Sequence, residues 1–328
     1  MKRYGRSVAG GFLAALAVLG LPSSQAQAQA YPTRSITMIV PFAAGGPTDV
    51  ISRIVTGHMA QTLGQTIIIE NVVGAGGTTA TTRASRAAND GYTLITGHMG
   101  THAASVPLYP NLAYHPEKNF EPVALLAGTP ILILARKDFP PKDLKEFVAY
   151  VKTNEAKVNA AHAGVGSVSN VSCELLNSIL GIKPTGVPFN GTGPAMNALV
   201  GGQVDYMCDQ IVNAVPQING GTIKAYAIAT PQRNPSLPNV PTTAEAGLPA
   251  FQAQAWNAIF APKGTPPAVV ARLNEAVVKA LDDEGVRKRL LDLGSVIPAA
   301  AERTPAALGA LVNKEIAKWT PVLKPVQN

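Results

Sequence analysis

A chain of 328 residues, 46% of them hydrophobic and 14% charged, has enough apolar side chains for one large globular domain or two medium ones. This composition excludes an intrinsically disordered protein, because such chains have too few apolar residues to form a core. The net charge of +7 is mild and is spread along the chain without a basic block among aromatics, which excludes a nucleic-acid-binding protein.

The first 30 residues have the features of a secretory signal peptide. A basic start precedes an uncharged apolar segment over residues 8–21, and small residues follow it. The apolar segment is too short to span a bilayer, and no cysteine stands near the cleavage site to carry a lipid anchor. We therefore predict export and cleavage after Ala28 or Ala30. The mature net charge would be +4, since removing three cations leaves 24 Lys and Arg against 20 Asp and Glu.

Residues 36–53 have the pattern of a strand, a glycine-rich turn and a helix start. Ile36–Val40 is a β-branched run typical of a buried strand, and Pro41 ends it. A helix should follow, capped by Thr48 or Asp49. Free N–H groups and the helix dipole at this point favour an anion, and a carboxylate fits better than a phosphate because the loop has no Lys or Arg. An ordinary β–α turn explains these residues equally well.

The same order of strand, polar glycine-rich loop and helix recurs along the chain. Further strands are expected at 66–70, 92–96, two runs within 123–135 that are separated at 128–130, and then 158–161, 185–189, 204–208, 223–230 and 256–262. Further helices are expected at 78–88, 143–152, from 164–170 through 180, at 195–200 and at 268–281. This order predicts an α/β fold with a parallel, helix-flanked sheet that binds ligands at the strand ends.

The units fall into two groups, 31–129 and 131–255, and a helical tail follows residue 256. We expect two lobes with a cleft between them, which the chain crosses twice. The sequence contains no P-loop, no H-E-x-x-H and no G-x-S-x-G motif. His98 and His102 lie four residues apart but across a glycine loop with no acid or cysteine nearby, which argues against a zinc site.

Several polar residues stand at the predicted loops without forming a catalytic set. Ser167, Ser169 and Thr192 lie at helix starts, where capping and ligand contact are compatible. Asp209 ends a strand and could enter the cleft, but it has no catalytic partner, and Trp256 fits the core or the cleft. Binding is therefore favoured over chemistry. For the two cysteines, Cys173 and Cys208, buried free thiols are favoured over a disulfide.

A series of short motifs in a fixed order covers nearly the whole mature chain. They include Tyr31-Pro32, Pro41-Phe42-x-x-Gly45-Gly46-x-Thr48-Asp49, Asn71-x-x-Gly74-Ala75-Gly76-Gly77, Gly100-Thr101-His102, Gly166-Ser167-x-Ser169, Gly201-Gly202-Gln203-Val204-Asp205 and Ala261-Pro262-Lys263-Gly264-Thr265-Pro266. With these motifs, residues 31–325 resemble the periplasmic solute receptors of tripartite tricarboxylate transporters, the Bug-type receptors.

The resemblance implies a two-lobed periplasmic binding protein of type II, a Venus flytrap, with a mixed, mostly parallel, helix-flanked sheet in each lobe. Residues 31–129 and 256–328 would form lobe 1, and residues 130–255 lobe 2. It further implies a periplasmic monomer without cofactor, metal or enzymatic activity, which binds a small carboxylate, a dicarboxylate first of all, and delivers it to membrane permease subunits. A receptor that signals through a membrane partner and an exported α/β hydrolase are the alternatives.

By position, the resemblance assigns ligand contacts to loops of both lobes. The first lobe would supply Phe42, Ala43, Ala44, Thr48 and Thr101; the second Ser167, Ser169, Asn170, Asn190, Gly191 and Thr192; the rim or hinge Asp209 and Trp256. The sequence departs from the family where Asn170 replaces a frequent His, Phe189-Asn190-Gly191 replaces Tyr-Lys-Gly, and Pro47 replaces a glycine. These changes leave open a dicarboxylate with a hydrogen-bonded far end or a bulky aromatic acid.

Overall fold

The computed structural model describes Met1 and residues 31–323, so the predicted signal peptide and its cleavage site lie outside the described residues. Within this part, the strands follow the order β2-β1-β3-β9-β4-β7-β5-β6, and β8 pairs with β4. Their bounds are β1 Ile36–Val40, β2 Ile67–Asn71, β3 Thr93–His98, β4 Phe120–Arg136, β5 Asn159–His162, β6 Thr185–Pro188, β7 Tyr206–Gln210, β8 Ile223–Ile228 and β9 Gln254–Pro262.

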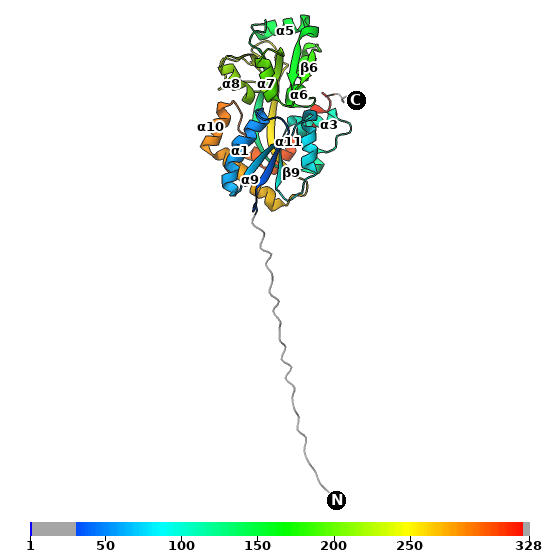
Figure 1. Cartoon of the computed structure of the whole chain (residues 1–328), viewed down its shortest axis with the longest axis vertical. Coiled ribbons are helices and arrows are strands. Elements are labelled where there is room, and N and C mark those ends of the chain that lie inside the picture. Colours follow the sequence, from blue (N-terminus) through cyan, green and yellow to red (C-terminus); the bar gives the residue numbers. More distant parts are fainter. Residues whose placement is uncertain (2–30, 324–328) are drawn as a thin grey trace. The chain divides into compact units, whose positions relative to one another are not determined.

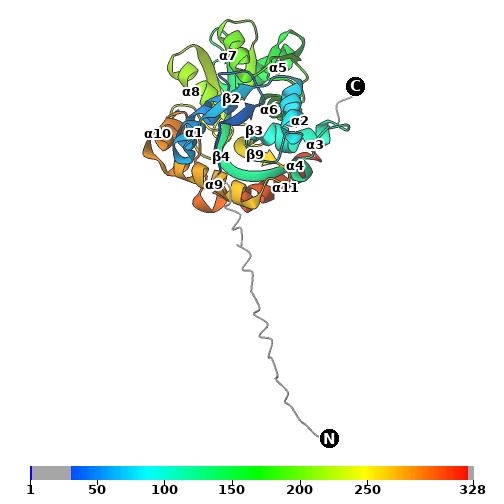
Figure 2. The ribbon, with the colours of Figure 1, turned by 60° about the horizontal axis from the view of Figure 1, so that its bottom comes forward.

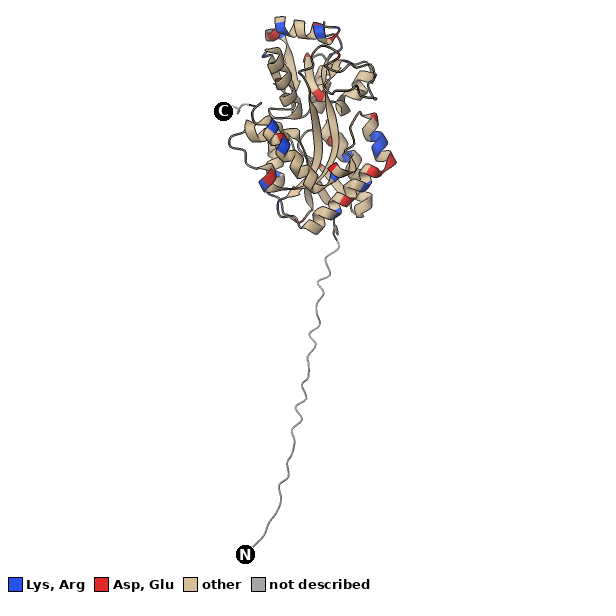
Figure 3. Ribbon diagram, turned by 180° about the vertical axis from the view of Figure 1, so that it is seen from behind, with Lys and Arg blue, Asp and Glu red and all other residues tan. Residues whose placement is uncertain are grey.

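Helices cover the outside of these strands (Figures 1 and 2). Their bounds are α1 Pro47–Leu63, α2 Thr78–Ser85, α3 Ser105–Leu108, α4 Pro116–Asn119, α5 Leu144–Thr153, α6 Val168–Leu180, α7 Thr192–Val200, α8 Ile211–Asn219, α9 Pro267–Asp282, α10 Glu284–Asp292 and α11 Pro305–Trp319, and a π-helical turn spans Gly100–Ala104. Among the described residues, none of these helices has the length and apolar character needed to cross a bilayer. Lys, Arg, Asp and Glu residues occur mostly in the helices (Figure 3).

In the described part of the chain, the parallel strand pairs form two groups of three strands. β1 pairs with β2 and β3 in one group, and β5 pairs with β6 and β7 in the other. The antiparallel strands β4 and β9 lie between the groups, and β4 also pairs with β8. The prediction of a mixed α/β fold is confirmed, and most predicted strands and helices agree with the observed bounds to within a few residues.

The long strand β4 corrects the prediction of two separate runs. β4 pairs with β9 as far as Pro130 and then with β7 and β8 from Ile131 onward. Gly128, Thr129 and Pro130 were expected to interrupt it, because glycine and proline usually do so. Instead, proline stands where the strand exchanges partners, so its missing N–H does not break a continuous ladder. β4 and β9 therefore connect the two groups of parallel strands.

The start of α1 also differs from the prediction. Gly46 is the N-cap and Pro47 is the first helical residue, so neither Thr48 nor Asp49 caps the helix. Proline is favoured at this position because its φ angle is already helical and its missing N–H would have no partner there. The Asp49 carboxylate turns back instead and accepts a hydrogen bond from the Gly45 N–H at 3.0 Å.

Candidate functional site

The loops that follow several parallel strands meet around a small cavity. The loop after β1 and the end of β3 contribute from one group of strands, and the loops after β5 and β6 and the end of β7 contribute from the other. The cavity is lined by Phe42, Gly46, Pro47, Thr48, Asp49, His98, Ala163, Ser167, Val168, Ser169, Thr192 and Gln210. The carboxyl ends of parallel strands are where open α/β sheets bind ligands, so this cavity is the candidate site.

Three helices begin at this cavity. The first intrahelical hydrogen bonds run from Val50 to Gly46 in α1, from Val171 to Ser167 in α6 and from Ala195 to Gly191 in α7. The backbone N–H groups that precede these donors in each helix have no acceptor within the helix, so they are free to bind a ligand. The starts of α1 and α7 touch, since a Cβ placed on Gly46 would lie 3.2 Å from the hydroxyl of Thr192. Three positive dipole ends directed at one cavity favour an anionic ligand.

The start of α6 presents two linked serine hydroxyls. Ser167 is the N-cap, as predicted, and its Oγ accepts a hydrogen bond from the Asn170 N–H at 3.2 Å. The Ser169 Oγ accepts from the Ala163 N–H at 2.9 Å and lies 3.2 Å from the Ser167 Oγ. Each hydroxyl has a single proton, and at most one of the two is used between them. At least one O–H therefore remains to donate to a ligand.

His98 lines the cavity at the end of β3 and is a site residue that the sequence reasoning considered only as a metal ligand. Its Nδ1 accepts hydrogen bonds from the N–H groups of Gly100 at 2.9 Å and Thr101 at 3.2 Å. Its ring stacks on Phe42 with centroids 5.1 Å apart. Burial lowers the pKa of His98 to about 4, against a smaller opposing effect of its backbone hydrogen bond. The neutral ring must therefore carry its proton on Nε2, as a donor.

Gln210, at the end of β7, is a second site residue that the sequence reasoning missed. Its Oε1 accepts hydrogen bonds from Thr129 at 2.7 Å and Asn257 at 3.0 Å. Asn257 also accepts from the hydroxyl of Thr48 at 3.1 Å. Because the oxygen of the Gln210 amide is held in this way, its NH₂ group is left to donate on the cavity side. The only sequence feature that marked Gln210 was its place as a polar residue at a strand end. Asp209 has the same feature, so the sequence could not distinguish the two.

Among the residues that the structure describes, no Lys or Arg lines the cavity. Arg53, the basic residue of the first turns of α1, pairs with Asp49 at 2.9 Å. Burial alone would raise the pKa of Asp49, but hydrogen bonds from Arg53, Gly45 and Asn71 outweigh it and lower that pKa. The Asp49 carboxylate is thus ionised and paired with Arg53, although Asp49 is among the residues that line the cavity. Among the described residues, no group of three or more His, Cys, Asp or Glu could hold a metal.

The structure brings five of the predicted site residues to the cavity, namely Phe42, Thr48, Ser167, Ser169 and Thr192. Asn190 lines an adjoining hollow, which Phe42 and Ala163 share with the cavity. Ala43 contacts this side as well, since its N–H donates to the Asn190 carbonyl at 3.0 Å. Gly191 and Ala44 belong to the same two loops, the one after β6 and the one after β1, which lie against each other.

The other predicted residues stand behind the cavity wall. The Thr101 hydroxyl lies 2.9 Å from His102 Nδ1, and Asn170 Oδ1 accepts from the Gly166 N–H at 3.0 Å. Asp209 is fully buried and accepts from Asn213 at 2.7 Å. Trp256 is buried on β9 and lines a different hollow. None of these four residues lines the cavity.

The facing loops are in direct contact. Tyr109 donates its hydroxyl hydrogen to the Val165 carbonyl at 2.8 Å. Gly76 lies so close to the Val165 carbonyl that a Cβ at this position would overlap it. These contacts join the loops of the two groups of strands beside the adjoining hollow.

The chain matches the family described as "Tripartite tricarboxylate transporter family receptor" over residues 51–327. It is 32% identical to Protein BugT of Bordetella pertussis, over 96% of this chain and 95% of BugT. It is similar to the structure of MatC from Rhodopseudomonas palustris with bound malate, with 59% identity, a TM-score of 0.87, and coverage of 89% of this chain and 99% of MatC. The R. palustris protein Rpa4515 with adipate shows 30% identity, a TM-score of 0.85 and coverage of 90% and 100%. These similarities confirm the predicted fold of a two-lobed periplasmic binding protein.

Proposed function

The chain belongs to the tripartite tricarboxylate transporter receptor family, and from this premise we propose that it binds a small dicarboxylate in the periplasm and delivers it to the permease subunits of such a transporter. Its family makes it a receptor and not an enzyme. The observation that carries the proposal is the convergence of three helix starts on a cavity whose lining, in the described part of the chain, has hydroxyl, imidazole and amide donors and no Lys or Arg. A carboxylate accepts hydrogen bonds from such donors without needing an ion pair.

We assign the ligand to the C4 dicarboxylates, of which malate is the first candidate. The protein with bound malate is 59% identical to this chain, whereas the protein with adipate is 30% identical. In this assignment one carboxylate accepts from the starts of α1 and α7 at Thr48 and Thr192, with Gln210 beside them. The other end meets Ser167 and Ser169 at the start of α6.

The proposed lobe boundaries follow from the strands that connect the halves. Lobe 1 comprises residues 31–129 and 256–328, and lobe 2 residues 130–255. The change of partners in β4 after Pro130 supports the first boundary. Opening would separate the loops around Phe42 and Gly76 from those around Val165 and Asn190, and ligand binding would favour the closed arrangement. The closed receptor, as a monomer, is the form that a permease would recognise.

The test is a titration of the purified, ligand-stripped receptor, by calorimetry and by thermal melting. We expect malate to bind most tightly, adipate more weakly, and the uncharged diamide of malate not at all. Malate at about 100 times its Kd should stabilise the protein by about 2.7 kcal/mol. Equal binding of the diamide, or no binding of any carboxylate, would overturn the proposal.

Two serine substitutions on one helix separate ligand contact from a general effect on α6. Ser169→Ala removes a hydroxyl that lines the cavity, whereas Ser178→Ala removes an exposed one nine residues further along the same helix. We expect Ser169→Ala to weaken malate binding about tenfold, which corresponds to about 1.4 kcal/mol. Ser178→Ala should bind malate as the wild type does.

A further inference from the structure

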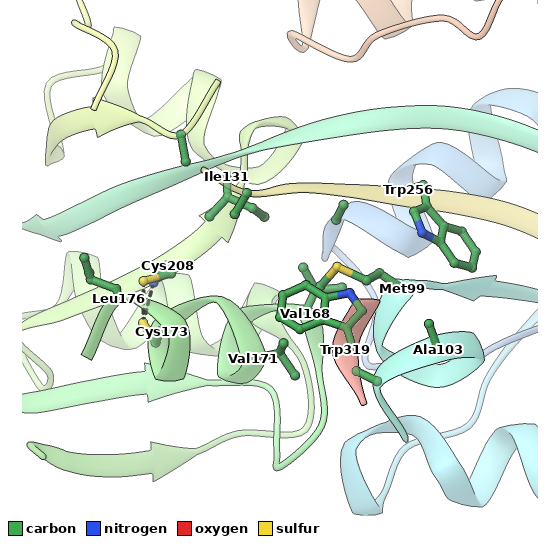
Figure 4. Packing of buried hydrophobic residues seen from close by; sticks show 14 of the residues in the cluster. Met99, Ala103, Ile131, Val168, Val171, Cys173, Leu176, Cys208, Trp256 and Trp319 are labelled. Carbon is green, nitrogen blue, oxygen red and sulfur yellow. Dashed lines mark hydrogen bonds between the residues drawn. The ribbon is translucent and has the colours of Figure 1, made fainter. Parts of the chain in front are cut away.

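We propose that Cys173 and Cys208 form an intramolecular disulfide in the exported protein, which joins α6 to β7 behind the binding cavity. The two sulfur atoms lie 2.6 Å apart, although the cysteines are 35 residues apart in the sequence. The Cys208 N–H also donates to the Cys173 Sγ at 3.0 Å, which holds the two side chains face to face. Figure 4 shows the two side chains pointing toward each other between the helix and the strand.

The pair lies in an apolar environment in which a free thiol has little else to bind. Both residues are buried, and Leu176 and Ile131 lie nearby (Figure 4). The sulfur separation is about 0.6 Å longer than a disulfide bond of about 2.05 Å, so bonding needs only a small adjustment of the two side chains. In an oxidising compartment outside the cytoplasm, cysteines placed in this way become oxidised. The inference thus rests on the export that is part of the proposed function.

The oxidation needs an external disulfide as the electron acceptor, such as that of an oxidised dithiol protein or of oxidised glutathione. The thiolate of one cysteine attacks the external disulfide, forms a mixed disulfide and releases one thiol. The second cysteine then attacks the mixed disulfide, closes the Cys173–Cys208 bond and releases the other thiol. Two electrons and two protons pass from the cysteine pair to the external disulfide, which ends as two thiols.

Because the cysteines become buried on folding, the disulfide has to form before folding is complete. Burial raises the pKa of the Cys208 thiol, with the neighbouring Cys173 as a further cause, so little thiolate forms in the folded protein. No external disulfide can reach the two sulfur atoms once α6 packs on β7, since both cysteines are buried. The bond must therefore form while the lobe folds. Reduction of the folded protein should likewise be slow unless it is unfolded.

The proposed bond would connect two sides of the cavity. Cys173 follows Ser169 by one helical turn in α6, and Cys208 comes two residues before Gln210 at the end of β7. A covalent bond between α6 and β7 would fix the serine hydroxyls relative to the Gln210 amide. This restraint lies within the second lobe and leaves the hinge strands β4 and β9 free to move.

The test is thiol labelling of the full chain after export, purified from the periplasm without reductant. The protein is unfolded in guanidinium with an alkylating maleimide, and its intact mass is measured with and without prior reduction. We expect no label before reduction and two labels after it, with the unlabelled oxidised chain about 2 Da lighter than the reduced one. Two labels without reduction would overturn the proposal, and so would a disulfide-linked dimer.

Melting temperatures provide a second readout. Reduction under unfolding conditions, followed by refolding in reductant, should lower the Tm of the wild type by about 6 °C, because the chain loses a crosslink over 35 residues. The double variant Cys173→Ala/Cys208→Ala should show no response to reductant, whatever its own Tm. Malate binding is measured on the same samples, so a failed carboxylate proposal and a missing disulfide give different results.

Discussion

The side chains of Gln210 and Asn257 share a hydrogen bond of 3.0 Å, although they come from β7 and β9 in different halves of the structure. Thr129 of β4 joins the pair at 2.7 Å from Gln210, and Thr48 of α1 joins it at 3.1 Å from Asn257. Asn257 is fully buried, so its polar atoms depend on these partners. The network therefore links β4 and β9, the two strands that cross between the halves, with the Gln210 amide, which lines the cavity.

Asn257→Ala tests this link without touching the cavity wall. The change leaves the Gln210 amide and the Thr48 hydroxyl each short of a partner, so we expect the free energy of unfolding to fall by about 1–3 kcal/mol. Malate affinity should fall about tenfold, because Gln210 is no longer held in its binding orientation. Asn313→Ala, at an exposed position of α11, is the matched control and should change neither quantity. Unchanged affinity in Asn257→Ala would exclude a role of the network in binding.

Gly76→Ala tests whether the ligand requires the closed form. Both Gly76 and Gly64 have positive φ angles, +61° and +70°, so alanine strains the backbone at either position by roughly 1 kcal/mol. Only at Gly76 does the added Cβ overlap a neighbour, the Val165 carbonyl across the cavity; Gly64 has nothing within 4 Å. We expect Gly76→Ala to weaken malate binding about 100-fold and to remain open in small-angle scattering with ligand. Gly64→Ala should close and bind normally, and equal affinities of the two variants would contradict this account.

Much of the fold could be predicted because its signals are local. The βα order, the β-branched run Ile36–Val40 and the helix over 144–153 all appear as short periodic patterns. β4 could not be predicted as one strand, because Gly128, Thr129 and Pro130 indicate a loop in their own neighbourhood. Pairing with β9, more than 120 residues away in the sequence, overrides that local preference. The start of α1 was missed for a similar reason, since the Thr48 hydroxyl bonds with distant Asn257 instead of capping.

Part of the candidate site could likewise be predicted from local sequence patterns, and part could not. Helix starts and their serine and threonine residues could be predicted, because strand, glycine turn and helix occur together in the sequence. The orientation of strand residues could not. Successive side chains of a strand point to opposite faces, so only one residue of each neighbouring pair can face the cavity. Gln210 faces it and Asp209 does not, and Asn257 joins the buried network whereas Trp256 lies toward another hollow.

Asp209→Asn tests the titration of the buried carboxyl group beside the site. Burial raises the pKa of Asp209 from 3.8 to about 7, against the opposing effect of hydrogen bonds from Asn213, the Gln210 N–H and Thr192. Between these two values the folded protein holds a proton that the unfolded chain has released. The free energy of unfolding must therefore fall as the pH rises from about 4 to about 7, and it levels off above this window.

Thermal melts of the wild type and Asp209→Asn across pH 4–8 measure this difference, since other titrating groups contribute equally to both. The wild type should lose stability relative to the variant as the pH rises, and the two curves should run parallel above about pH 7. Parallel curves over the whole range would mean that Asp209 is ionised throughout. A difference that grows toward acid pH in favour of the variant would give the opposite sign.

His98 supplies the last prediction, which concerns the donor that the neutral imidazole presents to the ligand. His98→Phe keeps the ring that stacks on Phe42 but removes the Nε2–H, whereas His98→Gln keeps an N–H donor at similar reach. We expect His98→Phe to weaken malate binding about tenfold and His98→Gln to retain most of the affinity. Normal malate binding by His98→Phe, with a loss only in His98→Gln, would assign His98 a packing role only.

The pH dependence of these affinities separates a neutral donor from a cation. Because burial lowers the pKa of His98 to about 4, its ring stays neutral from pH 6 to pH 8 in the folded protein. The ratio of wild-type to His98→Phe affinity should therefore be constant across this range, while effects of ligand ionisation and of Asp209 cancel in the ratio. A ratio that rises as the pH falls through about 6.5 would show instead that a charged imidazolium attracts the carboxylate.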